Sequence, residues 1–105
     1  MMREAEIYMF ERLAGRLRED EEGYWFQYDR DYLGNSPVPV SFTFPLQETA
    51  FHSNQLFPFF DGLIPEGWLL DIVVKSWKVN PRDRMGLLLA CCRDCIGAVS
   101  VREVR

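Results

Sequence analysis

The stretch FFDGLIPEGWLLD (residues 59–71) separates two kinds of sequence pattern in this chain. An aromatic run comes first, and Pro65-Glu66-Gly67-Trp68 then precedes a new apolar segment. Proline suits the first position of a helix, because its missing N–H would have no partner there anyway. An acidic residue such as Glu66 is favourable beside the positive end of a helix. The stretch therefore predicts a helix that begins at Pro65 and runs to about Trp77.

The residues before this stretch predict antiparallel strands. Apolar and polar residues alternate in 5–9 and 13–18, and an aromatic strand is expected at 24–28, after a turn. A loop over 29–39 leads to a fourth expected strand, Val40–Phe44, which ends before Pro45 because proline cannot donate to a central ladder. The alternation predicts that Trp25, Phe42 and Phe44 lie in the core.

The residues after the stretch predict a second helix and a last strand. Asn80 is a candidate N-cap, Pro81 suits the first helical position, and Asp83 adds an acid to the first turn. A helix is expected from Pro81 to about Cys91, and a strand from Ile96 to Arg102. The chain shows no repeat and no linker, so we expect one α+β domain over residues 1–105.

Charge and hydrophobicity exclude several classes of protein. The net charge is −4, and the 12 basic residues form no stripe, which argues against direct binding to DNA but is compatible with a basic protein partner. No apolar run approaches the ~18 residues that a membrane span needs. The acidic residues near the N-terminus do not fit a signal peptide. We therefore expect a cytoplasmic protein that contacts no membrane.

The sequence offers few residues for chemistry. His52 is the only histidine, and it has no nucleophile near it in the sequence. Cys92 and Cys95 have C-x-x-C spacing, but they follow a predicted helix, whereas a redox dithiol lies at a helix N-terminus. A zinc site needs about four ligands, and Cys91, Cys92, Cys95 and the distant His52 make a weak set. We expect no cofactor, no metal and no enzymatic activity; a thiol redox protein that uses Cys92 and Cys95 is the enzymatic alternative.

Four motifs occur in order along the chain: AGRL (14–17), PVSFTFPL (39–46), FFDGLIPEG (59–67) and DCIGA (94–98). This order resembles the first subdomain of HipA-type serine/threonine kinases, the toxins of bacterial type II toxin–antitoxin modules. The resemblance covers about residues 12–102. It implies an α+β fold in which a small, mostly antiparallel, β-barrel-like sheet of about five strands is capped by two helices.

The kinase body is missing from this sequence, which departs from the full-length family. Small proteins of this kind resemble the HipS family of three-gene HipBST modules. That resemblance implies an antitoxin that binds and neutralises a HipT-like kinase beside a HipB-like helix-turn-helix protein, so that DNA is contacted only indirectly. The alternative is a detached subdomain that completes the kinase fold without inhibiting it. A second departure is Cys92, where the family often has glycine, which would be strained if that position needs a left-handed backbone.

Trp68 is the main candidate for a partner-binding residue. On a helical wheel of about 100° per residue, an apolar arc that includes Ile72 forms the expected core face, whereas Asp71 and Lys75 lie on the polar face. Trp68 falls at the border between the two faces, so the wheel leaves two readings open. It is either packed on a neighbouring loop or an exposed anchor that enters the active-site region of the kinase. The candidate partner-binding residues are Pro65, Glu66, Gly67, Trp68, Asp71 and Lys75.

Overall fold

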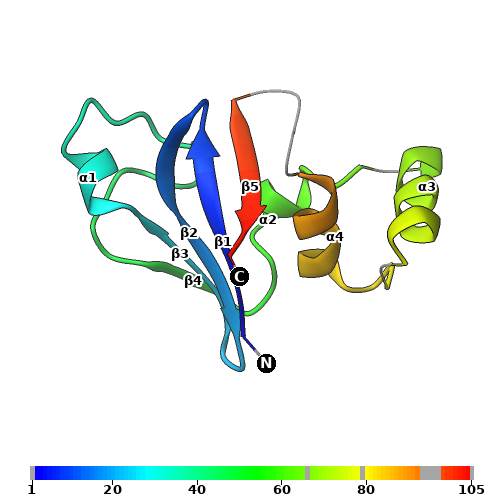
Figure 1. Cartoon of the computed structure of the whole chain (residues 1–105). Coiled ribbons are helices and arrows are strands. Elements are labelled where there is room, and N and C mark those ends of the chain that lie inside the picture. Colours follow the sequence, from blue (N-terminus) through cyan, green and yellow to red (C-terminus); the bar gives the residue numbers. More distant parts are fainter. Residues whose placement is uncertain (1, 66, 79, 93–97, 105) are drawn as a thin grey trace.

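The computed structural model of the chain describes residues 2–65, 67–78, 80–92 and 98–104, apart from the side chains of Trp68, Leu69, Val73 and Trp77. The described residues form five strands and four helices (Figure 1). The strands are β1 (Arg3–Met9), β2 (Arg12–Asp20), β3 (Gly23–Tyr28), β4 (Phe51–Ser53) and β5 (Val99–Glu103); the helices are α1 (Arg30–Leu33), α2 (Pro58–Asp61), α3 (Gly67–Trp77) and α4 (Arg84–Cys91). None of these helices is long and apolar enough to cross a membrane.

The five strands form one antiparallel sheet in the order β4-β3-β2-β1-β5. The last strand returns to pair with the first, so that Ile7 lies opposite Val101. Alternate residues point to the core face, where Ile7, Leu17 and Phe26 are fully buried. This arrangement confirms the predicted α+β class, the antiparallel sheet of about five strands and the positions of the three N-terminal strands.

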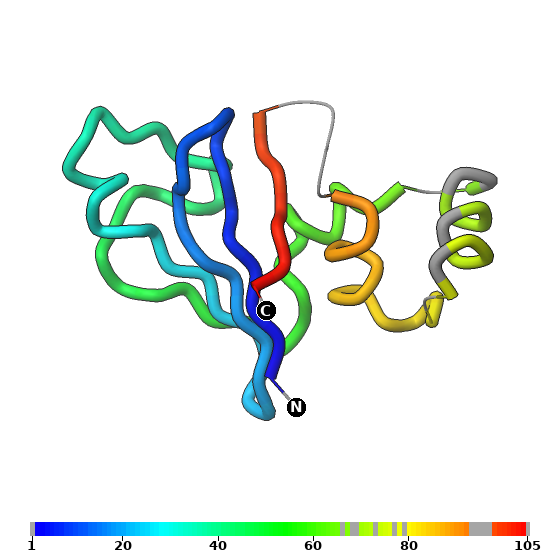
Figure 2. The backbone as a smooth tube through the Cα atoms, in the orientation of Figure 1, coloured from blue at the N-terminus to red at the C-terminus, as the bar shows by residue number. Residues whose placement is uncertain are grey.

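An aromatic cluster fills the space between the sheet and α2. The ring of Phe44 lies 4.7 Å from Phe26 and 5.5 Å from Phe60, measured between centroids, and Phe51 and Phe57 complete the cluster. The smooth trace shows α2 and α4 beside the sheet and α3 farther out, on the far side of α4 (Figure 2). The core therefore lies between the sheet and the helices α2 and α4, and the half-buried Leu70 and Val74 of α3 pack against it.

The predicted strand at Val40–Phe44 is wrong. These residues form bends and a turn in which the N–H of Phe44 donates to the carbonyl of Ser41 at 3.1 Å. Val40 and Phe44 are buried as expected, but Phe42 is fully exposed and Trp25 is only half-buried. Alternating apolar residues can therefore occur in a turn as well as in a strand. The N–H of Val40 and the carbonyl of Phe44 bond the hydroxyl of Tyr28 and not a neighbouring strand.

Three further boundaries differ from the sequence prediction. Asp83, not Asn80, is the N-cap of α4, because its side chain accepts a bond from the N–H of Gly86. Asn80 instead closes a turn before the helix, where its Oδ1 accepts the N–H of Arg82 at 2.9 Å. The predicted loop over 29–39 contains α1, which Asp29 caps, and β4 was not predicted because it has only three residues.

Candidate partner-binding site

The helix α3 begins at Gly67 and not at Pro65. Gly67 has a φ of +64°, a left-handed conformation that L side chains rarely adopt, whereas a Cβ built on it would meet no atom within 4 Å. The need for glycine here therefore comes from the backbone angle and not from crowding. Pro65, which is half-buried, lies before the helix. Glu66 lies outside the described residues, so its predicted role stays a prediction.

The outer face of α3 carries two of the candidate residues. Asp71 and Lys75 are both exposed and lie one helical turn apart, so their side chains share a face. Neither forms an ion pair with another residue that the structure describes. The side chain of Trp68 is not among those described, and both readings of it remain predictions.

The wheel placed Ile72 in the core face, and the structure contradicts this, since Ile72 is 49% exposed. Leu70 and Val74 are half-buried and pack against the core. The main neighbour of α3 among the described elements is α4, so the surface available to cover its apolar arc is narrow (Figure 1). Because the apolar arc of α3 is wider than the surface that packs against it, Ile72 is exposed to solvent.

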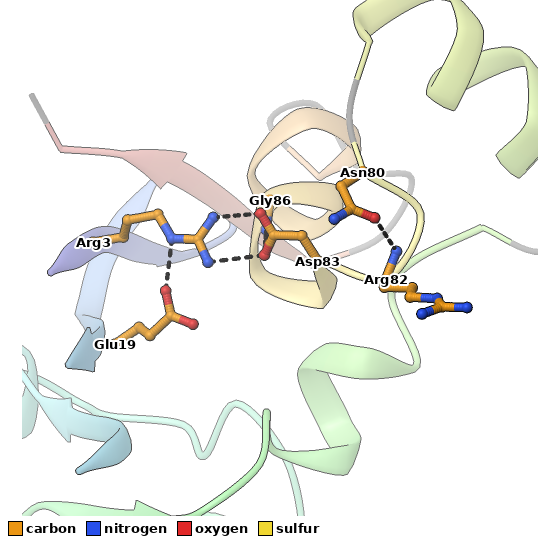
Figure 3. Close-up of polar contacts among 6 residues, drawn as sticks. All are labelled: Arg3, Glu19, Asn80, Arg82, Asp83 and Gly86. Atoms are coloured by element: carbon orange, nitrogen blue, oxygen red, sulfur yellow. Dashed lines mark hydrogen bonds and ion pairs between the residues drawn. The ribbon is translucent and has the colours of Figure 1, made fainter. Parts of the chain in front are cut away.

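The start of α4, the main described neighbour of α3, is held by ion pairs. Figure 3 shows the guanidinium of Arg3 in β1 against the carboxylate of Asp83, with two bonds of 2.8 Å. Arg3 also donates through Nε to Glu19 at 2.6 Å, and Asp83 accepts the N–H of Gly86 at 3.1 Å. The bonds from Arg3 hold the pKa of Asp83 below its usual value. One carboxylate thus caps the helix and joins it to the sheet.

A second ion pair joins the next residue of α4 to α2. Arg84 donates through Nε to Asp61 at 2.6 Å. Consecutive residues at the start of α4 are therefore tied to the sheet and to α2. Sequence reasoning missed both contacts because their partners lie 80 and 23 residues away along the chain. Opposite charge alone does not identify such a pair.

The residues that the sequence offered for metal binding or catalysis are His52 and the cysteines. The described residues contain no group of three or more His, Cys, Asp or Glu side chains that could hold a metal. His52 is exposed, its Nε2 lies 2.9 Å from the carbonyl of Glu22, and its ring lies 4.2 Å from that of Trp25. Cys92 is fully buried, and its φ of −107° is not left-handed, so the residue is unstrained where the family often has glycine. Cys95 lies outside the described residues.

The chain is similar to known proteins over nearly its whole length. The family model described as "HipA N-terminal domain" matches residues 5–102. An uncharacterized protein of Haemophilus influenzae is 35% identical over 103 residues, which cover 98% of this chain and 94% of that protein. A putative kinase, Y4mE, of Sinorhizobium fredii is 27% identical over 92 residues, which cover 86% of this chain and 22% of the kinase.

Two solved structures share the fold. An N-terminal domain of HipA toxin has a TM-score of 0.77 and 30% identity, with 98% of this chain and 93% of that chain covered. The HipA, HipB and operator DNA complex of the Shewanella oneidensis toxin–antitoxin system has a TM-score of 0.76 and 29% identity. That match covers 93% of this chain and 23% of the other, so this chain corresponds to less than a quarter of the longer relatives. By its sequence and its fold, the chain belongs to the HipA N-terminal domain family.

Proposed function

We propose that this protein, a single domain over residues 1–105, is the antitoxin of a type II toxin–antitoxin module. It binds and neutralises a HipT-like serine/threonine kinase and carries out no reaction of its own. A HipB-like protein joins the complex, and DNA is contacted through that protein. Two comparisons support this: a relative of nearly the same length exists in Haemophilus influenzae, and the solved Shewanella complex contains HipA, HipB and DNA.

The observation that carries the proposal is the exposure of α3. None of the described side chains of this helix is buried, its neighbour among the described elements is chiefly α4, and its apolar Ile72 is 49% exposed. Exposed apolar helix surface costs free energy unless a partner covers it. Asp71 and Lys75 flank the same surface and give it a polar border, which is the usual anatomy of a protein interface.

The sequence segment from Pro65 to Trp68 is the part of the protein that we assign to inhibition. The left-handed Gly67 turns the chain directly into α3, so Trp68 belongs to the first turn of the helix. A large rigid aromatic at the centre of an interface contributes ~2 kcal/mol or more to binding. We propose that Trp68 enters the active-site region of the kinase, with Glu66 beside it.

A second candidate function is a subdomain that completes the kinase without inhibiting it. The Sinorhizobium and Shewanella relatives favour it, because the matched segment is there one part of a much longer chain. The two candidate functions predict different effects on the activity of the kinase. An antitoxin lowers the activity of the kinase, whereas a completing subdomain leaves it unchanged or raises it.

Autophosphorylation of a HipT-like partner kinase tests the proposal. The kinase is assayed alone, with the wild-type protein, and with Trp68→Ala. Phe10→Ala is the matched control, because Phe10 is an aromatic residue that is 72% exposed in the β1–β2 turn. We expect wild type and Phe10→Ala to inhibit, and a folded Trp68→Ala to lose most inhibition. Stimulation by the wild-type protein, or binding without inhibition, would support the completing subdomain instead.

A further inference from the structure

Phe42 is an exposed aromatic residue that lies outside α3. Its relative exposure is 107%, the highest among the exposed large hydrophobic residues that the structure describes. Val38 and Leu46 in the same loop are 51% and 37% exposed. From Ser36 to Gln47 the loop has no charged residue, although 27% of the chain is charged. The loop therefore presents an uncharged apolar surface with Phe42 at its most exposed point.

Two buried tyrosines fix the backbone of this loop on both sides of Phe42. The hydroxyl of Tyr32 donates to the carbonyl of Val38 at 2.6 Å and accepts its N–H at 3.1 Å. The hydroxyl of Tyr28 accepts the N–H of Val40 at 3.0 Å and donates to the carbonyl of Phe44 at 2.5 Å. The two tyrosine rings are stacked, with centroids 6.1 Å apart. Four backbone groups of the loop are thus held from inside the protein.

The residues next to Phe42 restrict it further. Ser41 Oγ lies 3.0 Å from Thr43 Oγ1 and accepts the N–H of Thr43 at 3.2 Å, which closes the turn around Phe42. Phe44, two residues later, is buried in the aromatic cluster. An aromatic side chain on a backbone that is already ordered loses little conformational entropy when it binds. This is the property of an interface anchor, and it is unusual for a surface loop.

The size of the surface indicates what covers it. A phenylalanine buries about 150–250 Å² at most. Two copies of this loop facing each other would bury a few hundred Å², far below the ~1,200 Å² of a stable interface. A second copy held by this loop alone is therefore excluded by area. The surface suits an additional contact with a partner that is already held elsewhere.

The dimensions of the protein and of its longer relatives identify that partner. This chain measures 41 Å along its longest axis, and Figure 1 shows α3 at one end of it, with the segment between α1 and β4 across the sheet from α3. The matched segment is 22% of the putative kinase Y4mE, so the rest of that protein is several times larger than this chain. A partner of that size can reach both surfaces.

We propose that Phe42 is a second anchor for the kinase partner and inserts into an uncharged, apolar pocket on it. The inference rests on the proposed function, and it extends the interface from α3 to the loop that Tyr28 and Tyr32 hold. Phe42 holds the complex together, whereas Trp68 inhibits. Loss of Phe42 therefore raises the dissociation rate and leaves inhibition intact at saturating concentration.

Surface-immobilised kinase and the full-length protein provide the test. Wild type, Phe42→Ser and Met2→Ser are compared by biolayer interferometry, and each is checked by thermal melting. Met2 is the matched control, since it is 65% exposed and lies outside both surfaces. We expect Phe42→Ser to weaken binding at least tenfold, mainly through faster dissociation, with the melting temperature unchanged. Met2→Ser should bind like the wild type.

Each other outcome has a separate meaning. If the wild type and Phe42→Ser bind the kinase equally well, the second anchor is wrong, whereas the binding to the kinase that the proposed function requires stands. If the wild type does not bind the kinase, the proposed function and the anchor both fail. Sedimentation of the protein alone tests whether Phe42 serves self-association. If the wild type is a dimer that Phe42→Ser abolishes, and kinase binding is unchanged, Phe42 belongs to a dimer interface and the proposal is overturned.

Discussion

Asp83 accepts hydrogen bonds from both terminal nitrogens of Arg3, a residue 80 positions earlier in the chain. The same carboxylate caps α4 through the N–H of Gly86. The first strand of the sheet and the start of α4 therefore share one anchor. The helix that this anchor holds, α4, is the main described neighbour of α3.

Substitutions of Asp83 separate its two roles. Asp83→Asn keeps a good N-cap acceptor but loses the ion pair, whereas Asp83→Ala loses both. Since the Asp83 side chain is 34% exposed, the solvent-screened pair contributes about 1 kcal/mol at most, and the cap about 1 kcal/mol more. We expect the free energy of unfolding to fall in the order wild type, Asp83→Asn, Asp83→Ala, as measured by urea denaturation at pH 7.

The pH dependence of stability tests the same contact. The pKa of Asp83 is lower in the folded protein, mainly through its bonds to Arg3, so the carboxylate stabilises the fold at pH values above its unfolded pKa of about 3.9. This contribution is lost as the pH falls through the folded pKa. The difference in melting temperature between wild type and Asp83→Asn should therefore shrink from pH 7 to pH 3. A constant difference would mean that the ion pair contributes nothing.

Gly86→Ala distinguishes helix propensity from local packing. Alanine in a helix is favoured over glycine by about 1 kcal/mol, which alone predicts a more stable protein. A Cβ on Gly86, however, would lie 2.5 Å from Oδ2 of Asp83, which Arg3 holds in place. We expect the variant to be destabilised by about 1–2 kcal/mol in urea denaturation.

The double variant with Asp83→Ala checks the cause. Once the carboxylate is gone, alanine at position 86 should stabilise the protein relative to Asp83→Ala alone, so the effect of the same substitution changes sign. If Gly86→Ala stabilises the wild-type protein, the contact between Gly86 and Asp83 is looser than the structure indicates.

Local sequence patterns predicted most of the sheet, because the alternation of apolar and polar residues lies within each strand. Alternation places Ile7 and Leu17 on the buried face, and both are fully buried. The same reasoning failed at Val40–Phe44, where alternation is equally clear. There the hydroxyl of Tyr28 bonds the N–H of Val40 and the carbonyl of Phe44, which a neighbouring strand would otherwise bond. An alternation of period two contains no information on such a distant side chain.

The candidate site was predictable only in part. The Pro65 to Trp68 motif located the start of α3, but the wheel assumed that the whole apolar arc would be covered, and Ile72 is not. Amphipathic periodicity shows which residues share a face, and it contains no information on how wide the covering surface is. Figure 3 shows the second reason: Arg3 and Asp83, which join α4 to the sheet, lie 80 residues apart in the sequence.

Tyr28→Phe tests how firmly the Phe42 loop is held. The substitution keeps the ring and removes the hydroxyl, which leaves the buried N–H of Val40 and the carbonyl of Phe44 without this partner. We expect a loss of about 2 kcal/mol in the free energy of unfolding and faster amide exchange in the loop. Tyr8→Phe is the control, because its hydroxyl makes only a 3.4 Å contact with Glu6. Equal effects of the two substitutions would mean that the Tyr28 hydroxyl does not hold the loop.

Charge reversal on α3 tests whether this helix faces the kinase. Asp71 and Lys75 are exposed and lie outside every described ion pair, so Asp71→Lys and Lys75→Glu should leave the melting temperature nearly unchanged. At the border of an interface, a reversed charge changes affinity by about 1 kcal/mol, or roughly fivefold, and mainly through the association rate. We expect at least one variant to bind the kinase more weakly, with the difference shrinking in high salt because exposed charges are screened. Glu21→Lys, in the exposed turn between β2 and β3, is the matched control. If both α3 variants bind like Glu21→Lys at low salt, α3 is not the surface that meets the kinase.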